Sequence, residues 1–168
     1  MMRIVLSILV SNSSGVLNRV SGLFSRRGYN IDSLTVGPTE DEGISRITVV
    51  AQGDQLVLEQ ISKQVRKLED VREVFVLPTG SSVYRELVLI KVQADATERA
   101  DLVSIVDIFR ARIVDVAPNS IVIEMTGDEP KVNGLLAMLD GFNIIEIVRT
   151  GLAGISRGLD SVNKKDDN

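Results

Sequence analysis

The sequence contains no cysteine and no histidine, and their absence removes much of the chemistry that proteins carry out. Thiolate nucleophiles, imidazole bases, disulfides and Cys/His zinc sites are all unavailable to this chain. Lysine, carboxylate and serine side chains remain, but they form no compact catalytic motif in the sequence. We therefore predict that the chain has no catalytic residues and binds no metal and no cofactor of its own.

Basic and aromatic residues are also scarce. The 168 residues include 19 basic against 23 acidic side chains, and only 4% are aromatic. An acidic chain offers no electrostatic surface to nucleic acid or to an anionic membrane, and RNA-reading sheets need aromatic side chains. The apolar run at residues 4–10 is interrupted by Ser7 and is too short to cross a bilayer. We expect a cytoplasmic protein whose partners include neither nucleic acid nor membrane.

The hydrophobic residues that are present predict two copies of one topology. In the first half we expect strands at 4–10, 29–36, 47–51 and 71–77, with helices at 16–24 and 58–68. In the second half we expect strands at 86–93, 113–116, 121–125 and 144–148, with helices at 102–109 and 132–139. Each half thus has the order βαββαβ of a ferredoxin-like domain. We predict an α+β fold with domains at 1–79 and 80–158 and a flexible tail at 159–168.

The junction between the first strand and the first helix is rich in small polar residues. Asn12, Ser13 and Ser14 precede Gly15, and the helical pattern begins at Val16. A helix N-terminus has unpaired backbone N–H groups and partial positive charge, so this junction could hold a carboxylate. The alternative is ordinary helix capping by one of the polar side chains, with no ligand.

A second polar position, Asn30, stands near the start of the predicted strand at 29–36. This strand is an edge in a ferredoxin-like sheet and has neither Lys nor Pro to discourage pairing, so we expect it to pair with a second copy. A two-fold axis would bring Asn30 of one subunit near the helix N-terminus of the other. The alternative is that Asn30 only completes a turn after Gly28. The predicted effector-binding residues are Asn12, Gly15, Val16, Leu17, Asn30 and Ile31.

The acidic run from Glu40 to Glu42 is the remaining candidate for chemistry. Carboxylates can ligate a hard cation, but three of them at the tip of a predicted hairpin are typical of a solvated turn. We assign no metal there.

The run from Ser14 to Val36 resembles the ACT domain of the small regulatory subunits of acetolactate synthase. The similarity continues through residues 45–49, 85–92, 108–110, 113–116 and 154–158. It departs at Asn18, where relatives often have Ser. Essentially the whole chain is covered.

This resemblance implies a subunit that binds the catalytic subunit, raises its activity and confers feedback inhibition by valine or another branched-chain amino acid. It implies that condensation of two pyruvates to 2-acetolactate, with its thiamine diphosphate, Mg²⁺ and FAD, belongs to that partner. It also implies a homodimer through the ACT domains, with effector-binding roles for Asn12, Gly15 and Asn30. Two alternatives are another amino-acid-sensing ACT regulator and a small acylphosphatase-like hydrolase on the same fold.

Overall fold

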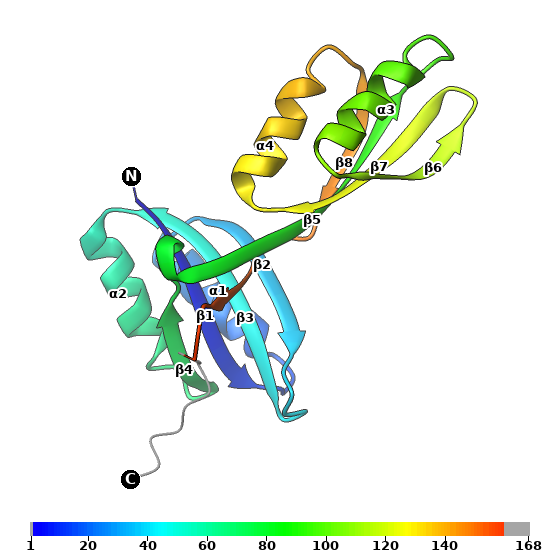
Figure 1. Cartoon of the computed structure of the whole chain (residues 1–168). Coiled ribbons are helices and arrows are strands. Elements are labelled where there is room, and N and C mark those ends of the chain that lie inside the picture. The colour runs from blue at the N-terminus through cyan, green and yellow to red at the C-terminus, as the bar shows by residue number, and fades with distance from the viewer. Residues whose placement is uncertain (1, 160–168) are drawn as a thin grey trace. The chain divides into compact units, whose positions relative to one another are not determined.

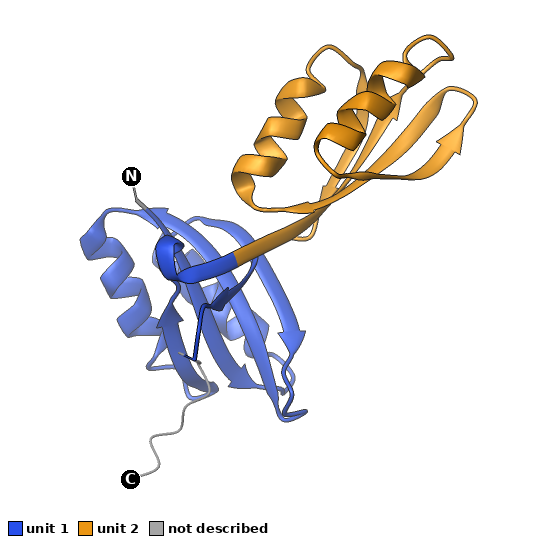
Figure 2. Ribbon diagram, viewed as in Figure 1, with its two compact units in different colours: residues 1–83, 152–168 blue, residues 84–151 orange. Residues whose placement is uncertain are grey.

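The computed structural model describes residues 2–159, which divide into two compact units (Figure 2). One unit contains residues up to Val83 together with the chain from Leu152 onward, and the other contains residues 84–151. Residues 152–159 therefore belong to the first unit, whereas the predicted domain boundaries place residues 152–158 in the second domain. Residues 160–168, most of the predicted tail, lie outside the described residues.

The first unit is built on a four-stranded antiparallel sheet in the order β2-β3-β1-β4 (Figure 1). Its strands are β1 (Met2–Ser11), β2 (Ile31–Pro38), β3 (Ile44–Gly53) and β4 (Val71–Val76). Two helices, α1 (Val16–Arg26) and α2 (Gln55–Val65), follow β1 and β3. This is the predicted βαββαβ order, with β2 at one edge of the sheet.

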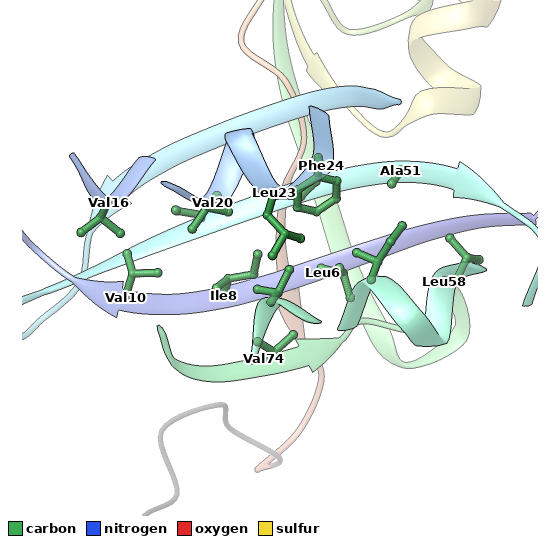
Figure 3. Close-up of a cluster of buried hydrophobic side chains, with 14 residues drawn as sticks. Leu6, Ile8, Val10, Val16, Val20, Leu23, Phe24, Ala51, Leu58 and Val74 are labelled. Carbon is green, nitrogen blue, oxygen red and sulfur yellow. The ribbon is translucent and has the colours of Figure 1, made fainter. Parts of the chain in front are cut away.

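Helix α1 forms because its apolar residues recur on one face, and that face packs against the sheet (Figure 3). Val16, Val20, Leu23 and Phe24 are buried against the helix side of β1 and β3. The helix ends at Arg26, and Gly28 follows the C-cap Arg27 with a φ of +69°, which suits a residue without a Cβ. The apolar periodicity of the sequence thus becomes the core beneath the candidate site.

Phe24 offers a test of this core, because its side chain has no exposed surface and meets the Tyr29 ring edge to face at 6.5 Å. We expect Phe24→Ala to lower the free energy of unfolding by about 3–5 kcal/mol, because it leaves a cavity in the core. Urea denaturation followed by circular dichroism measures the change. Leu56→Ala, at a side chain that is 72% exposed, is the control and should change stability by less than about 0.5 kcal/mol. Equal losses in the two variants would contradict this assignment of the core.

The face of the first sheet opposite the helices carries the C-terminal segment of the chain. Strand β9 (Ala153–Ser156) lies against β1 and pairs with β5, and Leu152 just before it is only 4% exposed. The short helix η1 (Thr79–Ser81) ends nearby, where the Ser81 carbonyl accepts a 2.8 Å hydrogen bond from the Arg157 N–H. Strand β9 was not predicted from the sequence, because four residues are too few to establish an alternating pattern.

The second unit repeats the topology of the first. Its strands are β5 (Ser82–Gln93), β6 (Arg112–Ala117), β7 (Ser120–Gly127) and β8 (Ile144–Arg149), in the order β6-β7-β5-β8. Helices α3 (Arg99–Ile108) and α4 (Glu129–Met138) pack on one face, over a core that includes Val88, Ile90 and Ile123. The predicted two-domain α+β architecture is therefore confirmed.

Candidate functional site

The first helix begins with a glycine turn rather than with a polar cap. Gly15 occupies the N-cap position of α1 with φ of +83°, and no side chain makes a capping hydrogen bond there. The first turn also contains no acidic residue. Because the first N–H groups of a helix have no partner within it, this N-terminus presents donors and positive potential without a carboxylate from its own first turn.

Asn12 serves a different purpose from the capping that its sequence position also allowed. Its side-chain Nδ2 donates to the Glu42 carbonyl at 2.9 Å, and its backbone N–H donates to the Gly43 carbonyl at 2.8 Å. The capping alternative is therefore wrong for Asn12, because its amide is held by the turn between β2 and β3. This arrangement fixes Asn12 beside the end of β1, next to the turn that leads into α1.

A charged side chain that the sequence analysis did not select stands over this helix N-terminus. Arg19 lies one turn along α1, and a Cβ built on Gly15 would come within 3.0 Å of its Nη1. Its Nε donates to Asp70 Oδ2 at 2.5 Å, and this bond raises the pKa of Arg19 above its ordinary value. Asp70 is itself in place because its carbonyl accepts from the Ser11 N–H at 2.9 Å. The Arg19 guanidinium thus adds a cationic group next to Gly15, beside the partial positive charge of the helix N-terminus.

Asn30 and Ile31 lie at the other end of the sheet within the same chain. Ile31 is opposite Ala51 in the β2–β3 register, whereas Ser11 is opposite Ile44 at the other end of β3. The interval from Ile44 to Ala51 corresponds to roughly 23 Å of extended strand. One chain therefore brings Asn12 and Gly15 through Leu17 together but does not bring Asn30 or Ile31 to them.

The amide of Asn30 is oriented by its neighbours on β2 and β3. Its Nδ2 donates to Asp32 Oδ1 at 2.9 Å, and Asp32 Oδ2 accepts from Gln52 Nε2 at 2.7 Å. Asn30 is exposed, and Gly28 before it completes the turn that leaves α1. The alternative role of Asn30 as a turn residue thus describes part of the local geometry.

The acidic tip between β2 and β3 has a structural use of its own. Asp41 Oδ1 accepts from the Gly43 N–H at 2.8 Å, and Thr39 Oγ1 donates to the Asp41 carbonyl at 3.0 Å. Throughout residues 2–159, no three Asp or Glu side chains gather into a group that could hold a metal ion. Within the same residues, no helix has the length and hydropathy required to span a membrane.

Comparison with known proteins identifies both parts of the chain. Residues 6–73 match the AHAS small subunit-like ACT domain, and residues 85–158 match the small subunit of acetolactate synthase. The chain belongs to the acetolactate synthase small-subunit family. The second match decides against a regulator that shares only the ACT domain, because it extends through β9.

Relatives of similar length support this assignment to the acetolactate synthase small subunits. The probable small subunit from Methanothermobacter thermautotrophicus is 48% identical over 155 residues, which cover 92% of each chain. The small subunit of isozyme 3 from Escherichia coli is 47% identical over 158 residues, covering 94% of this chain and 97% of that protein. This small subunit is thus similar to these relatives over nearly their whole length.

A solved structure shows the same architecture. The crystal structure of the acetolactate synthase small subunit from Thermotoga maritima aligns with a TM-score of 0.87 and 38% sequence identity. The alignment covers 94% of this chain and 99% of that one. The expected ferredoxin-like fold with an N-terminal ACT domain is confirmed.

Proposed function

We propose that this small subunit is the regulatory subunit of acetolactate synthase: it activates the catalytic subunit and lets valine, or another branched-chain amino acid, inhibit it. The observation that carries the proposal is the match of nearly the whole chain to acetolactate synthase small subunits, with an ACT domain over residues 6–73. The chain itself is non-catalytic in this proposal. Condensation of pyruvate, with thiamine diphosphate, Mg²⁺ and FAD, takes place on the catalytic subunit.

The geometry of the first unit supports an effector site shared between two copies. Strand β2 is an edge of its sheet and contains no Lys, and Pro38 stands only at its far end. If two β2 strands pair about a two-fold axis, they run antiparallel, so the Asn30 end of one strand lies beside the Pro38 end of the other. That end is also where the mate's Asn12 is held, beside Glu42 and Gly43. The separation of roughly 23 Å within one chain is thereby closed between chains.

In this arrangement each group contacts a different part of the bound amino acid. The N–H groups at Gly15, Val16 and Leu17, with the Arg19 guanidinium beside them, receive the carboxylate of the amino acid. The side-chain amides of Asn12 and of Asn30 from the mate bind its polar groups. Apolar surface for an aliphatic side chain comes from Ile31, which is half-buried, and from Leu17, which is 42% exposed.

Inhibition requires more than binding. An effector changes the output of the assembly only if it binds two of its states with different affinities. A site across the dimer interface meets this condition, because a change in the β2 pairing changes both the site and the surface that the dimer presents to the catalytic subunit.

The proposal is tested by mixing the small subunit with its catalytic subunit, measuring acetolactate formation and titrating valine, leucine and isoleucine. We expect Asn30→Ala to raise the inhibitory concentration of valine about tenfold or more, because one polar contact to the ligand is lost, while activation is retained. Asn18→Ala is the matched control, since Asn18 is exposed on α1 and its carbonyl accepts the Ser21 hydroxyl.

Two results would contradict the proposal. Absence of any response of the wild-type assembly to all three amino acids would remove the feedback role. A normal valine response in Asn30→Ala would remove Asn30 from the site.

A further inference from the structure

The C-terminal residues 152–157, which we call the strap, are attached to the strand that carries the candidate effector residues. The Leu152 N–H donates to Ser33 Oγ at 2.8 Å, and Thr35 Oγ1 donates to the Leu152 carbonyl at 3.1 Å. Leu34 between them packs toward the helix-side core, so Ser33 and Thr35 face the opposite side of the sheet. Two hydroxyls of β2 therefore hold both backbone groups of one strap residue.

Beyond Leu152 the strap is attached only loosely to β2. A groove of about 390 Å³ separates Ala153, Gly154 and Ile155 from the β2–β3 hairpin, and Ile155 is 57% exposed. Residues 153–156 form β9, which pairs with β5 rather than with β2, and the Arg157 N–H donates to the Ser81 carbonyl. The connection between strap and β2 is thus concentrated at Leu152.

The sheet surface near this connection is polar. Thr35, Thr48 and Ser7 are in register across β2, β3 and β1, which places a row of hydroxyls on one face. Ser7 is fully buried, and its Oγ has no hydrogen-bond partner. A buried hydroxyl without a partner lowers the stability of the arrangement that buries it.

The chain just before the strap is attached to the second unit. The Thr150 N–H donates to the Leu87 carbonyl at 3.1 Å, and Thr150 Oγ1 accepts from the Leu87 N–H at 3.1 Å. Only Gly151, with φ of +91°, separates this attachment on β5 from Leu152. A displacement of β2 that carries Leu152 with it therefore acts on the second unit through a single residue.

We propose that Ser33 and Thr35 are positioning residues of regulation, which couple the effector-bearing strand β2 to the strap and through it to the second unit. Ile31 of the candidate site is two residues before Ser33 on the same strand. Movement of β2 on effector binding is passed to Leu152 by the two hydroxyl bonds, in a contiguous chain of contacts. The inference rests on the proposed function, because it concerns the response to that effector.

The test is the double variant Ser33→Ala/Thr35→Val, which removes both hydroxyls with little change in volume. In the full chain we expect the valine dissociation constant, measured by calorimetry, to stay within about twofold of the wild type. In the assembly with the catalytic subunit, the inhibitory concentration of valine should rise about tenfold or more, which is the size of a typical allosteric coupling. Activation of the catalytic subunit should persist. Ser104→Ala, which removes an exposed hydroxyl on α3, is the matched control.

Hydrogen exchange supplies a second measurement, made on both the wild type and the double variant. We expect valine to change the exchange rate of the peptide spanning residues 150–157 in the wild type, and to leave that peptide unchanged in the double variant. A merely structural role of the two hydroxyls would alter stability but not abolish this valine-dependent difference.

The outcomes separate the coupling from the function on which it rests. A wild type that binds and responds to valine, together with a double variant that is inhibited equally well, would overturn the coupling and leave the proposed function intact. Loss of valine binding in the double variant would also overturn it, because the two residues would then belong to the site. A wild type without any valine response would overturn both proposals.

Discussion

Replacing Gly15 with aspartate is expected to abolish inhibition by valine while activation of the catalytic subunit persists. The new carboxylate would occupy the space where the carboxylate of the effector is proposed to bind, beside the N-terminus of α1 and Arg19. Repulsion between like charges, together with neutralisation of Arg19, should weaken valine binding about 100-fold or more. Asp is among the residues that tolerate a φ of +83°, so the variant should fold. Calorimetric titration with valine and the acetolactate assay measure the two effects.

Gly15→Ala is the matched control for the backbone at this turn. A methyl group there meets Arg19 Nη1 at 3.0 Å, which is the mobile end of a long side chain, and it adopts the same left-handed conformation. The resulting strain should weaken valine binding less than about fivefold. If alanine and aspartate impair binding equally, backbone strain rather than charge is the cause. A normal valine response in Gly15→Asp would place the carboxylate elsewhere.

The fold could be predicted from the sequence because the apolar residues of each helix and strand recur with a regular local period. The four buried apolar residues of α1 at positions 16, 20, 23 and 24 face one core, and the alternation at Val88, Ile90 and Val92 marks a strand buried on one side. Such patterns depend on neighbours within a few residues. The strap had no comparable signal, since its attachment joins Leu152 to residues about 120 positions earlier in the chain.

The candidate site was predictable in its residue types but not in its geometry. The glycine and the polar residues before α1 pointed to a helix N-terminus, yet the hydrogen bond of Asn12 to Glu42 depends on a turn 30 residues away. Arg19 and Asp70 are 51 residues apart, so nothing local indicated that this pair stands beside Gly15. One feature of the sequence did indicate a cationic group near Gly15. Arg19 follows Gly15 by four residues, and residues four apart lie on the same face of a helix.

If each effector site is divided between two subunits, as proposed, two variants impaired in valine binding should restore one another. In a heterodimer of Gly15→Asp with Asn30→Ala, one site combines both substitutions and the other combines two unaltered halves. At valine concentrations that fill only unaltered sites, each homodimer should bind little valine, whereas the heterodimer should bind about half of the wild-type stoichiometry. Co-expression with two different affinity tags isolates the heterodimer, and calorimetry counts its sites.

A site formed within one chain predicts the opposite result for valine binding by this heterodimer. If Asn30 and Gly15 of the same chain formed one site, every site of the heterodimer would carry a substitution, and no binding would return. A heterodimer of Gly15→Asp with Asn18→Ala is the reference for mixing, because it keeps one unaltered site in either geometry and should bind about half of the wild-type stoichiometry. Restoration in both heterodimers but in neither Gly15→Asp nor Asn30→Ala homodimers requires that the ligand contact two chains, since the register of β2 and β3 separates Asn30 from Gly15 within one.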